Sequence, residues 1–220
     1  MIYQVRLLKG LLHPQELFFQ LHKAEVIKGL KPRIFLLFVF SIIIYAMSAF
    51  YGMGTESISK ELAELPRSEF ETRKLLFMLG KIAWAILYTA IILFVPAAFF
   101  WVFTDLPFNK VVVIQLIAAC LLLLEKALVF LVASIWGLNR FSSPFSLGVV
   151  SQYVIEYEFL IYFFSFISIF SVWTIYFQYN GIKKISNKEP KMVALMVVGI
   201  NLIFWLIASL FSIIKFEKLL

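Results

Sequence analysis

The chain has 220 residues, of which 62% are hydrophobic, and its formal net charge is +7. Globular domains contain about 45–50% apolar residues, so this composition excludes an ordinary soluble enzyme and leaves no room for a sizeable soluble domain. The apolar residues form long continuous runs. They predict an integral membrane protein made of helices, because unpaired backbone groups are too costly in lipid.

Five apolar runs are long enough to cross a bilayer, which takes roughly 20 helical residues. They are 34–53, 82–103, 111–138, 159–179 and 192–214. We therefore predict an all-α protein in which a cytoplasmic segment, 1–32, precedes a membrane domain of five transmembrane helices, 33–220.

The N-terminal segment has the pattern of an amphipathic helix that begins at Pro14, a residue suited to the first helical position. Glu16 lies in the first turn, where the helix dipole favours a negative charge. Leu17, Phe18 and Leu21 share one face. Such a helix is typical of a membrane surface, and this face would then contact lipid or a partner protein. A helix that packs on the ends of the spans fits the same pattern equally well.

The loop between the first two runs contains signals for ordered structure. Residues 61–65 predict a short helix that stops at Pro66, and Ser68 with Glu71 predicts a capping box. We expect the helix that follows to continue directly into the second run. Pro96, in the middle of that run, is expected to kink it.

Two further segments shape the predicted topology. Turn residues at 105–109 indicate that the second and third runs form an antiparallel hairpin. Residues 145–150 are apolar but too short to cross a membrane, and they predict an interfacial or re-entrant piece before the fourth run.

The basic residues indicate an orientation, because Lys and Arg favour the cytoplasmic side of a membrane. Five spans place the basic segment 6–33 on the same side as four lysines of the last connection, Lys183, Lys184, Lys188 and Lys191. We predict a multi-pass protein of the cell membrane with its N-terminus in the cytoplasm and its C-terminus outside. Juxtamembrane lysines of this kind favour anionic headgroups or a cytoplasmic partner over nucleic acid.

Glu125 and Lys126 stand in the middle of the third run. A charge at this depth costs ~2.5–3.5 kcal/mol on insertion scales. Adjacent helical residues point about 100° apart, so each side chain is expected to meet a partner on another span. The candidate partners are Gln115, Thr89, Ser165, Ser168, Thr174 and Asn201. The pair is a polar contact that fixes helix packing, a substrate or proton site, or the place of a bend that brings the two charges nearer to water.

The sequence contains no zinc-protease motif, no serine-hydrolase elbow and no Walker-type loop. His13 and His22 have no ligands at metal-binding spacing. The lone Cys120 cannot form an intramolecular disulfide. We predict a protein without enzymatic activity, cofactor or metal.

Residues 13–19 (HPQELFF), followed by a basic stretch and a span, resemble the start of bacterial members of the YIP family of Ypt/Rab-interacting-protein-like membrane proteins. Residues 169–173 (IFSVW), 181–185 (GIKKI) and the mid-span Pro96 are similar to that family too. The charged pair in the third run and the charged loop at 54–81 depart from it.

The resemblance implies five spans, a cytoplasmic N-terminus and a membrane adaptor without enzymatic activity. Bacterial members of the family accompany export systems such as ABC transporters. The predicted function is thus a non-enzymatic accessory or scaffolding protein that binds the lipid bilayer and another membrane complex, an export transporter, and a homo-oligomer is also compatible. The alternative is a small transporter or channel that uses Glu125 and Lys126.

Overall fold

The computed structural model describes residues 1–53, 66–136 and 143–213, and most of these residues are helical. The helices are α1 (Leu7–Leu12), α2 (Pro14–Lys23), α3 (Leu30–Phe50), α5 (Arg67–Phe103), α6 (Phe108–Trp136), α7 (Gly148–Val154), α8 (Glu158–Ser165), α9 (Ile169–Ile185) and α10 (Pro190–Ile213). Two short strands, β1 (Ile2–Gln4) and β2 (Val26–Lys28), pair in parallel with Ile2 opposite Val26. The helix predicted for 61–65 lies outside the described residues.

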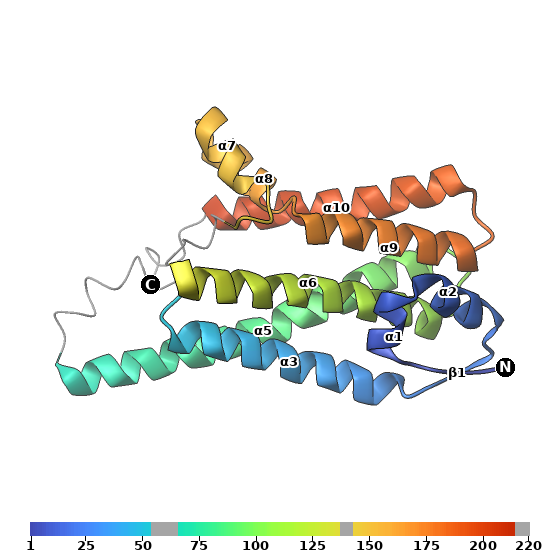
Figure 1. Ribbon diagram of the computed structural model, residues 1–220, viewed down its shortest axis with the longest axis horizontal. Helices are drawn as coiled ribbons and strands as arrows, with labels where there is room; N and C mark the ends of the chain where they lie inside the picture. The colour runs from blue at the N-terminus through green and yellow to red at the C-terminus, as the bar shows by residue number, and fades with distance from the viewer. Residues whose placement is uncertain (54–65, 137–142, 214–220) are drawn as a thin grey trace.

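Five long helices run side by side along the molecule in alternating directions (Figure 1). They are α3, α5, α6, α9 and α10. The helix α6 lies between the others and contacts α3, α5 and α9. Apolar residues predominate on all its sides, as expected of a helix surrounded by protein. From Val111 to Ala119 every side chain on it is buried.

Four helices are long and apolar enough to cross a membrane: α3, α5 from Glu69 onward, α6 and α10. They correspond to the first, second, third and fifth predicted spans. The prediction of a helical membrane protein is therefore confirmed. The outward surfaces of these helices carry many exposed large apolar side chains, as a lipid-facing surface requires.

The prediction of one continuous helix at 159–179 is wrong, because the chain breaks there into α8 and α9. Ser168 begins α9 with a capping box: its hydroxyl accepts from the Ser171 backbone N–H at 3.0 Å, and the Ser171 hydroxyl accepts from the Ser168 N–H at 2.8 Å. The α9 helix then runs to Ile185, beyond the predicted end. Its 17 residues are roughly 25 Å long.

The segment predicted as interfacial or re-entrant forms a turn and then α7. Together α7 and α8 make a hairpin that projects sideways from one end of the bundle, where α8 packs on α10 (Figure 1). The turn contacts the break described above: the Leu147 N–H donates to the Ile167 carbonyl, and the Ile169 N–H donates to the Phe145 carbonyl, both at 3.0 Å.

The helix α5 runs without interruption from Arg67 to Phe103, which confirms that the loop helix continues into the second span. Its predicted start at Ser68 is wrong. Pro66 occupies the N-cap position, and the helix has no side-chain cap, so Ser68 lies inside the first turn. Pro96 lies within α5 without ending it. The α5–α6 hairpin predicted from the turn at 105–109 is also confirmed.

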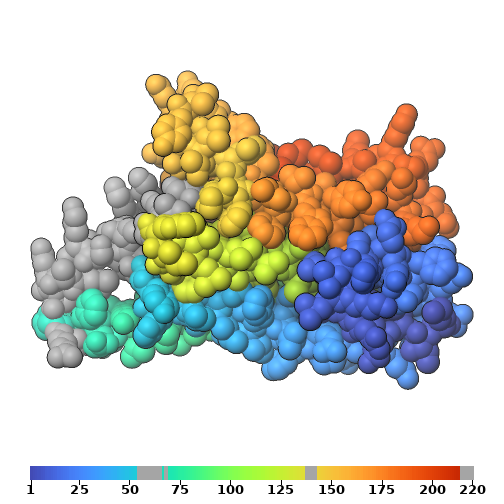
Figure 2. Space-filling model, in the orientation of Figure 1, coloured from blue at the N-terminus to red at the C-terminus, as the bar shows by residue number. Residues whose placement is uncertain are grey.

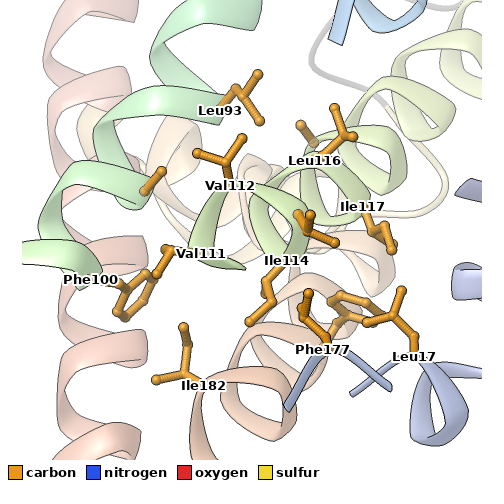
Figure 3. Packing of buried hydrophobic residues seen from close by; sticks show 14 of the residues in the cluster. Leu17, Leu93, Phe100, Val111, Val112, Ile114, Leu116, Ile117, Phe177 and Ile182 are labelled. Carbon is orange, nitrogen blue, oxygen red and sulfur yellow. The ribbon is translucent and has the colours of Figure 1, made fainter. Parts of the chain in front are cut away.

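The segment of β1, α1, α2 and β2, here called the N-terminal cap, is seated on one end of the bundle (Figure 2). Leu17, Phe18 and Leu21 of α2 are 3%, 1% and 0% exposed. The Phe18 ring lies against that of Phe177 on α9, with centroids 4.9 Å apart. Figure 3 shows Leu17 beside Phe177, close to α6.

The three side chains predicted to contact lipid or a partner protein are thus buried within the chain itself. Of the two alternatives for this helix, the structure has the one in which it packs on the ends of the spans. The physical reason is close approach: at Gly181 of α9, an added Cβ would lie 2.9 Å from Phe18 Cε1. The absence of a side chain there lets α2 lie directly on α9.

Candidate functional site

Glu125 and Lys126 lie in the second half of α6, and both are half-buried. Glu125 is close enough to Tyr88 of α5 to interact with it electrostatically. The Tyr88 ring faces that of Tyr45 on α3, with centroids 6.0 Å apart. Lys126 also makes an interaction of its own. Glu125 therefore lies near the place where α3, α5 and α6 meet.

The polar residues predicted as partners of this pair have other roles. Gln115 lies ten positions before Glu125, roughly 15 Å along the helix, which is too far for contact. It accepts instead a hydrogen bond from Gln178 Nε2 on α9 at 2.8 Å. Gln178 Oε1 in turn accepts from Asn201 Nδ2 on α10, also at 2.8 Å. This amide chain joins α6, α9 and α10.

The remaining predicted partners are used locally or are left unpaired. The Ser165 hydroxyl donates to the Ile161 carbonyl at 2.7 Å, within its own helix, and Ser168 caps α9. Thr89 and Thr174 are 0% and 1% exposed, and neither hydroxyl has a hydrogen-bond partner among the residues that the structure describes.

Sequence analysis missed Gln178, which lies inside a predicted span like Gln115 and Asn201. An amide in an apolar run is a signal that could have identified it, because a buried amide requires a partner. Gln115 and Gln178 are 0% and 3% exposed, so this amide chain lies inside the bundle. Amides do not titrate, so the arrangement serves helix packing rather than proton transfer.

The end of the bundle that carries the N-terminal cap is strongly basic. The cap and the connection between α9 and α10 both lie at this end (Figure 1). Lys110 of α6 links the bundle to the N-terminal cap at this end, because its side chain donates to the His22 carbonyl at 3.0 Å. The end holds eleven basic and four acidic residues: Arg6, Lys9, Lys23, Lys28, Lys31, Arg33, Lys110, Lys183, Lys184, Lys188 and Lys191 against Glu16, Glu25, Asp105 and Glu189.

The four lysines of the last connection are not equivalent. Lys183, Lys184 and Lys191 are exposed. Lys188 is half-buried and forms an ion pair with Asp105 at 3.3 Å, so its charge is already partnered within the chain. The predicted contact with lipid or a partner therefore rests on the three exposed lysines.

Within 1–53, 66–136 and 143–213, no group of three or more His, Cys, Asp and Glu side chains could hold a metal ion. His13 lies on the N-terminal cap beside a cavity described below, and Cys120 is half-buried in α6. Neither belongs to a group of three or more such side chains in the described part of the chain.

Comparisons of the chain with protein-family models, with curated proteins and with solved structures find no match.

Proposed function

We propose that this protein is a non-enzymatic accessory or scaffolding protein that associates with another membrane complex, an export transporter of the ABC class. The observation that carries the proposal is the basic end of the bundle, where Lys183 and Lys184 are exposed on the last turn of α9. Two adjacent exposed lysines at the end of a membrane helix suit an acidic cytoplasmic segment of a partner. The resemblance to the YIP family, which remains a prediction, supports the same adaptor role.

The packing of the interior also supports a scaffolding role. Phe100, Ile114 and Ile182 fill the space between α5, α6 and α9, and each is 0% exposed (Figure 3). A pathway for ions or solutes along the bundle axis would have to displace these side chains. A densely packed apolar interior of this kind instead provides a rigid support for contacts at its surface.

The proposal includes five spans, with α9 counted as the fourth despite its length. It also includes a cytoplasmic N-terminus in the cell membrane, because the basic end would then face the cytoplasm. With five antiparallel helices, the last described residue of α10 lies at the opposite end, which would be outside.

Charge reversal tests the proposed partner contact. The double substitution Lys183→Glu with Lys184→Glu should abolish co-purification of the partner in mild detergent, measured by mass spectrometry, because it places like charges at the contact. The matched control is Arg73→Glu with Lys74→Glu, two adjacent exposed basic residues on α5 toward the other end. The control should keep the partner.

Two outcomes would contradict the accessory role. One is a wild-type protein that purifies alone or only with copies of itself. The other is equal loss of the partner in both double variants, which would indicate a general charge effect rather than a contact at the basic end.

A small transporter or channel remains the second candidate. The observation that favours it is the electrostatic interaction of Glu125 with Tyr88, near the place where α3, α5 and α6 meet. Ionisable residues at such depth commonly mark substrate or proton pathways.

A further inference from the structure

The N-terminal cap contains a cavity of about 230 Å³ between β1, α1 and α2. The residues that line it include Tyr3, Arg6, Lys9, His13 and Glu16. Cavities that hold drug-sized ligands measure about 300–1,000 Å³, so this one suits a single small polar group.

Close packing of α1 forms the wall of this cavity. Gly10 lines it, and an added Cβ there would lie 2.5 Å from Leu17 Cδ1 and 2.7 Å from Ile117 Cδ1. The absence of a side chain therefore lets α1 lie directly against α2 and α6. The packing of Gly10 against Leu17 and Ile117 thus both forms the cavity wall and attaches the N-terminal cap to the bundle.

The lining favours an anion. Arg6 and Lys9 contribute two positive charges against the one negative charge of Glu16. Lys9 is paired with Glu16 at 3.0 Å, whereas none of the ion pairs formed among the described residues uses Arg6. Lys9 and His13 also hold the pKa of the Glu16 carboxyl below its ordinary value, so that charge persists at neutral pH.

Tyr3 adds a buried hydrogen-bond donor. Its side chain is 6% exposed, and burial raises the pKa of its hydroxyl although Arg6 opposes the change. The hydroxyl therefore stays protonated at neutral pH and can donate to an anion. A guanidinium, an ammonium and a hydroxyl in one small cavity are the groups that bind phosphate oxygens.

The helix α1 carries two exposed leucines, each next in sequence to a residue that lines the cavity. Leu8 and Leu12 of α1 are 78% and 72% exposed. They are four residues apart, so they lie on the same face of the helix. Exposed leucines beside a phosphate-binding cavity, at the end of a membrane bundle, match the two parts of a phospholipid.

We propose that this cavity binds the headgroup phosphate of an anionic phospholipid, with Leu8 and Leu12 against its acyl chains. The proposal is independent of the accessory role, because the lipid would bind whether or not the bundle has a protein partner.

The test is an equilibrium binding measurement on the full chain in neutral detergent. The probes are fluorescent phosphatidylglycerol, fluorescent phosphatidylcholine and, as a soluble competitor, glycerol phosphate. Both lipids carry the phosphate, but the choline of phosphatidylcholine would bring a positive charge close to Arg6 and Lys9. Phosphatidylglycerol should therefore bind at least about tenfold more tightly. Glycerol phosphate should compete only weakly, because it lacks acyl chains.

Two variants with opposite expected effects test the residues. Arg6→Gln with Lys9→Gln should weaken phosphatidylglycerol binding about tenfold or more. Glu16→Gln should strengthen it, since this substitution removes the negative charge and releases Lys9. The matched control, Lys28→Gln with Lys31→Gln, removes two exposed charges at the same end outside the cavity and should change binding little. Thermal melting checks that each variant is folded.

A third variant separates the sources of the phosphate. Leu8→Gln with Leu12→Gln should weaken lipid binding and leave glycerol phosphate binding unchanged. Tight glycerol phosphate binding together with no effect of this variant would assign the cavity to a soluble phosphate and overturn the lipid proposal. Three outcomes would overturn the site itself. They are equal binding of the two lipids, an equal loss of lipid binding in the charge variant and its control, and weaker lipid binding by Glu16→Gln.

Discussion

At the scale of single residues, the polar groups within the bundle fall into two kinds. Gln115, Gln178 and Asn201 are linked by hydrogen bonds across three helices. In membrane proteins such interhelical hydrogen bonds contribute roughly 0.6–2 kcal/mol each. Glu125 and Lys126 are different, because they carry charges into a region that four apolar helices define as membrane-spanning. Their adjacency keeps that region close to neutral.

Removing one of these charges should cost more than removing both. Glu125→Leu or Lys126→Leu leaves an uncompensated charge in a low-dielectric interior, which is expected to cost about 3–5 kcal/mol if the pair serves packing. The double variant leaves no such charge and should melt at a higher temperature than either single variant, in scans in detergent. Well-folded single and double variants that all lack flux in reconstituted vesicles would instead support the transporter alternative.

At the scale of elements, the break between α8 and α9 is stabilised by side chains and by a neighbouring segment. The Ser168–Ser171 capping box and the backbone bonds from Phe145 and Leu147 satisfy the polar groups that a broken helix exposes. Irregular backbone is tolerated at membrane depth only where the protein supplies such partners. The turn before α7 and the start of α9 therefore act as one structural unit.

Loss of the Ser168–Ser171 capping box should selectively weaken the unit formed by the turn before α7 and the start of α9. Ser168→Ala with Ser171→Ala removes the capping hydrogen bonds and should lower stability by about 1–2 kcal/mol. The control is Ser165→Ala, whose hydroxyl bonds only within α8; this change should be close to neutral. Thermal melting and amide hydrogen exchange at the start of α9 provide the measurement. Unchanged amide hydrogen exchange in the double variant would show that the Ser168–Ser171 capping box does not stabilise the break between α8 and α9.

At the scale of the whole molecule, alternating helices place the N-terminal cap and the connection between α9 and α10 at one end (Figure 1). The Lys188–Asp105 ion pair and the bond from Lys110 to the His22 carbonyl link the segments of this end. Exposed ion pairs contribute little to stability, so the arrangement depends chiefly on buried contacts such as Phe18 with Phe177.

Reporter fusions test the orientation of the molecule in the membrane. A reporter that is active only outside should be active when fused after Leu220 and inactive when fused after Asn187, because positive residues are retained in the cytoplasm. Protein level, measured by immunoblot, is the control for each fusion. Activity after Asn187 together with inactivity after Leu220 would refute the five-span arrangement.

The amino-acid sequence alone was enough to predict the membrane class, the helical character and four helices long and apolar enough to cross a bilayer. Continuous apolar runs carry this information directly, because lipid accepts only a hydrogen-bonded backbone. The charged pair at Glu125 and Lys126 was also visible, since charges stand out in an apolar run.

Only the tertiary structure decided where α2 lies, where the fourth run breaks and which polar residues meet. An apolar face such as Leu17, Phe18 and Leu21 fits lipid and protein equally well, and the choice depends on Gly181, more than 150 positions further along the chain. The break at Ser168 likewise depends on backbone partners near Phe145. Hydrophobic periodicity predicts which face of a helix must be covered. Contacts between segments far apart in the sequence decide whether lipid or another part of the protein covers that face.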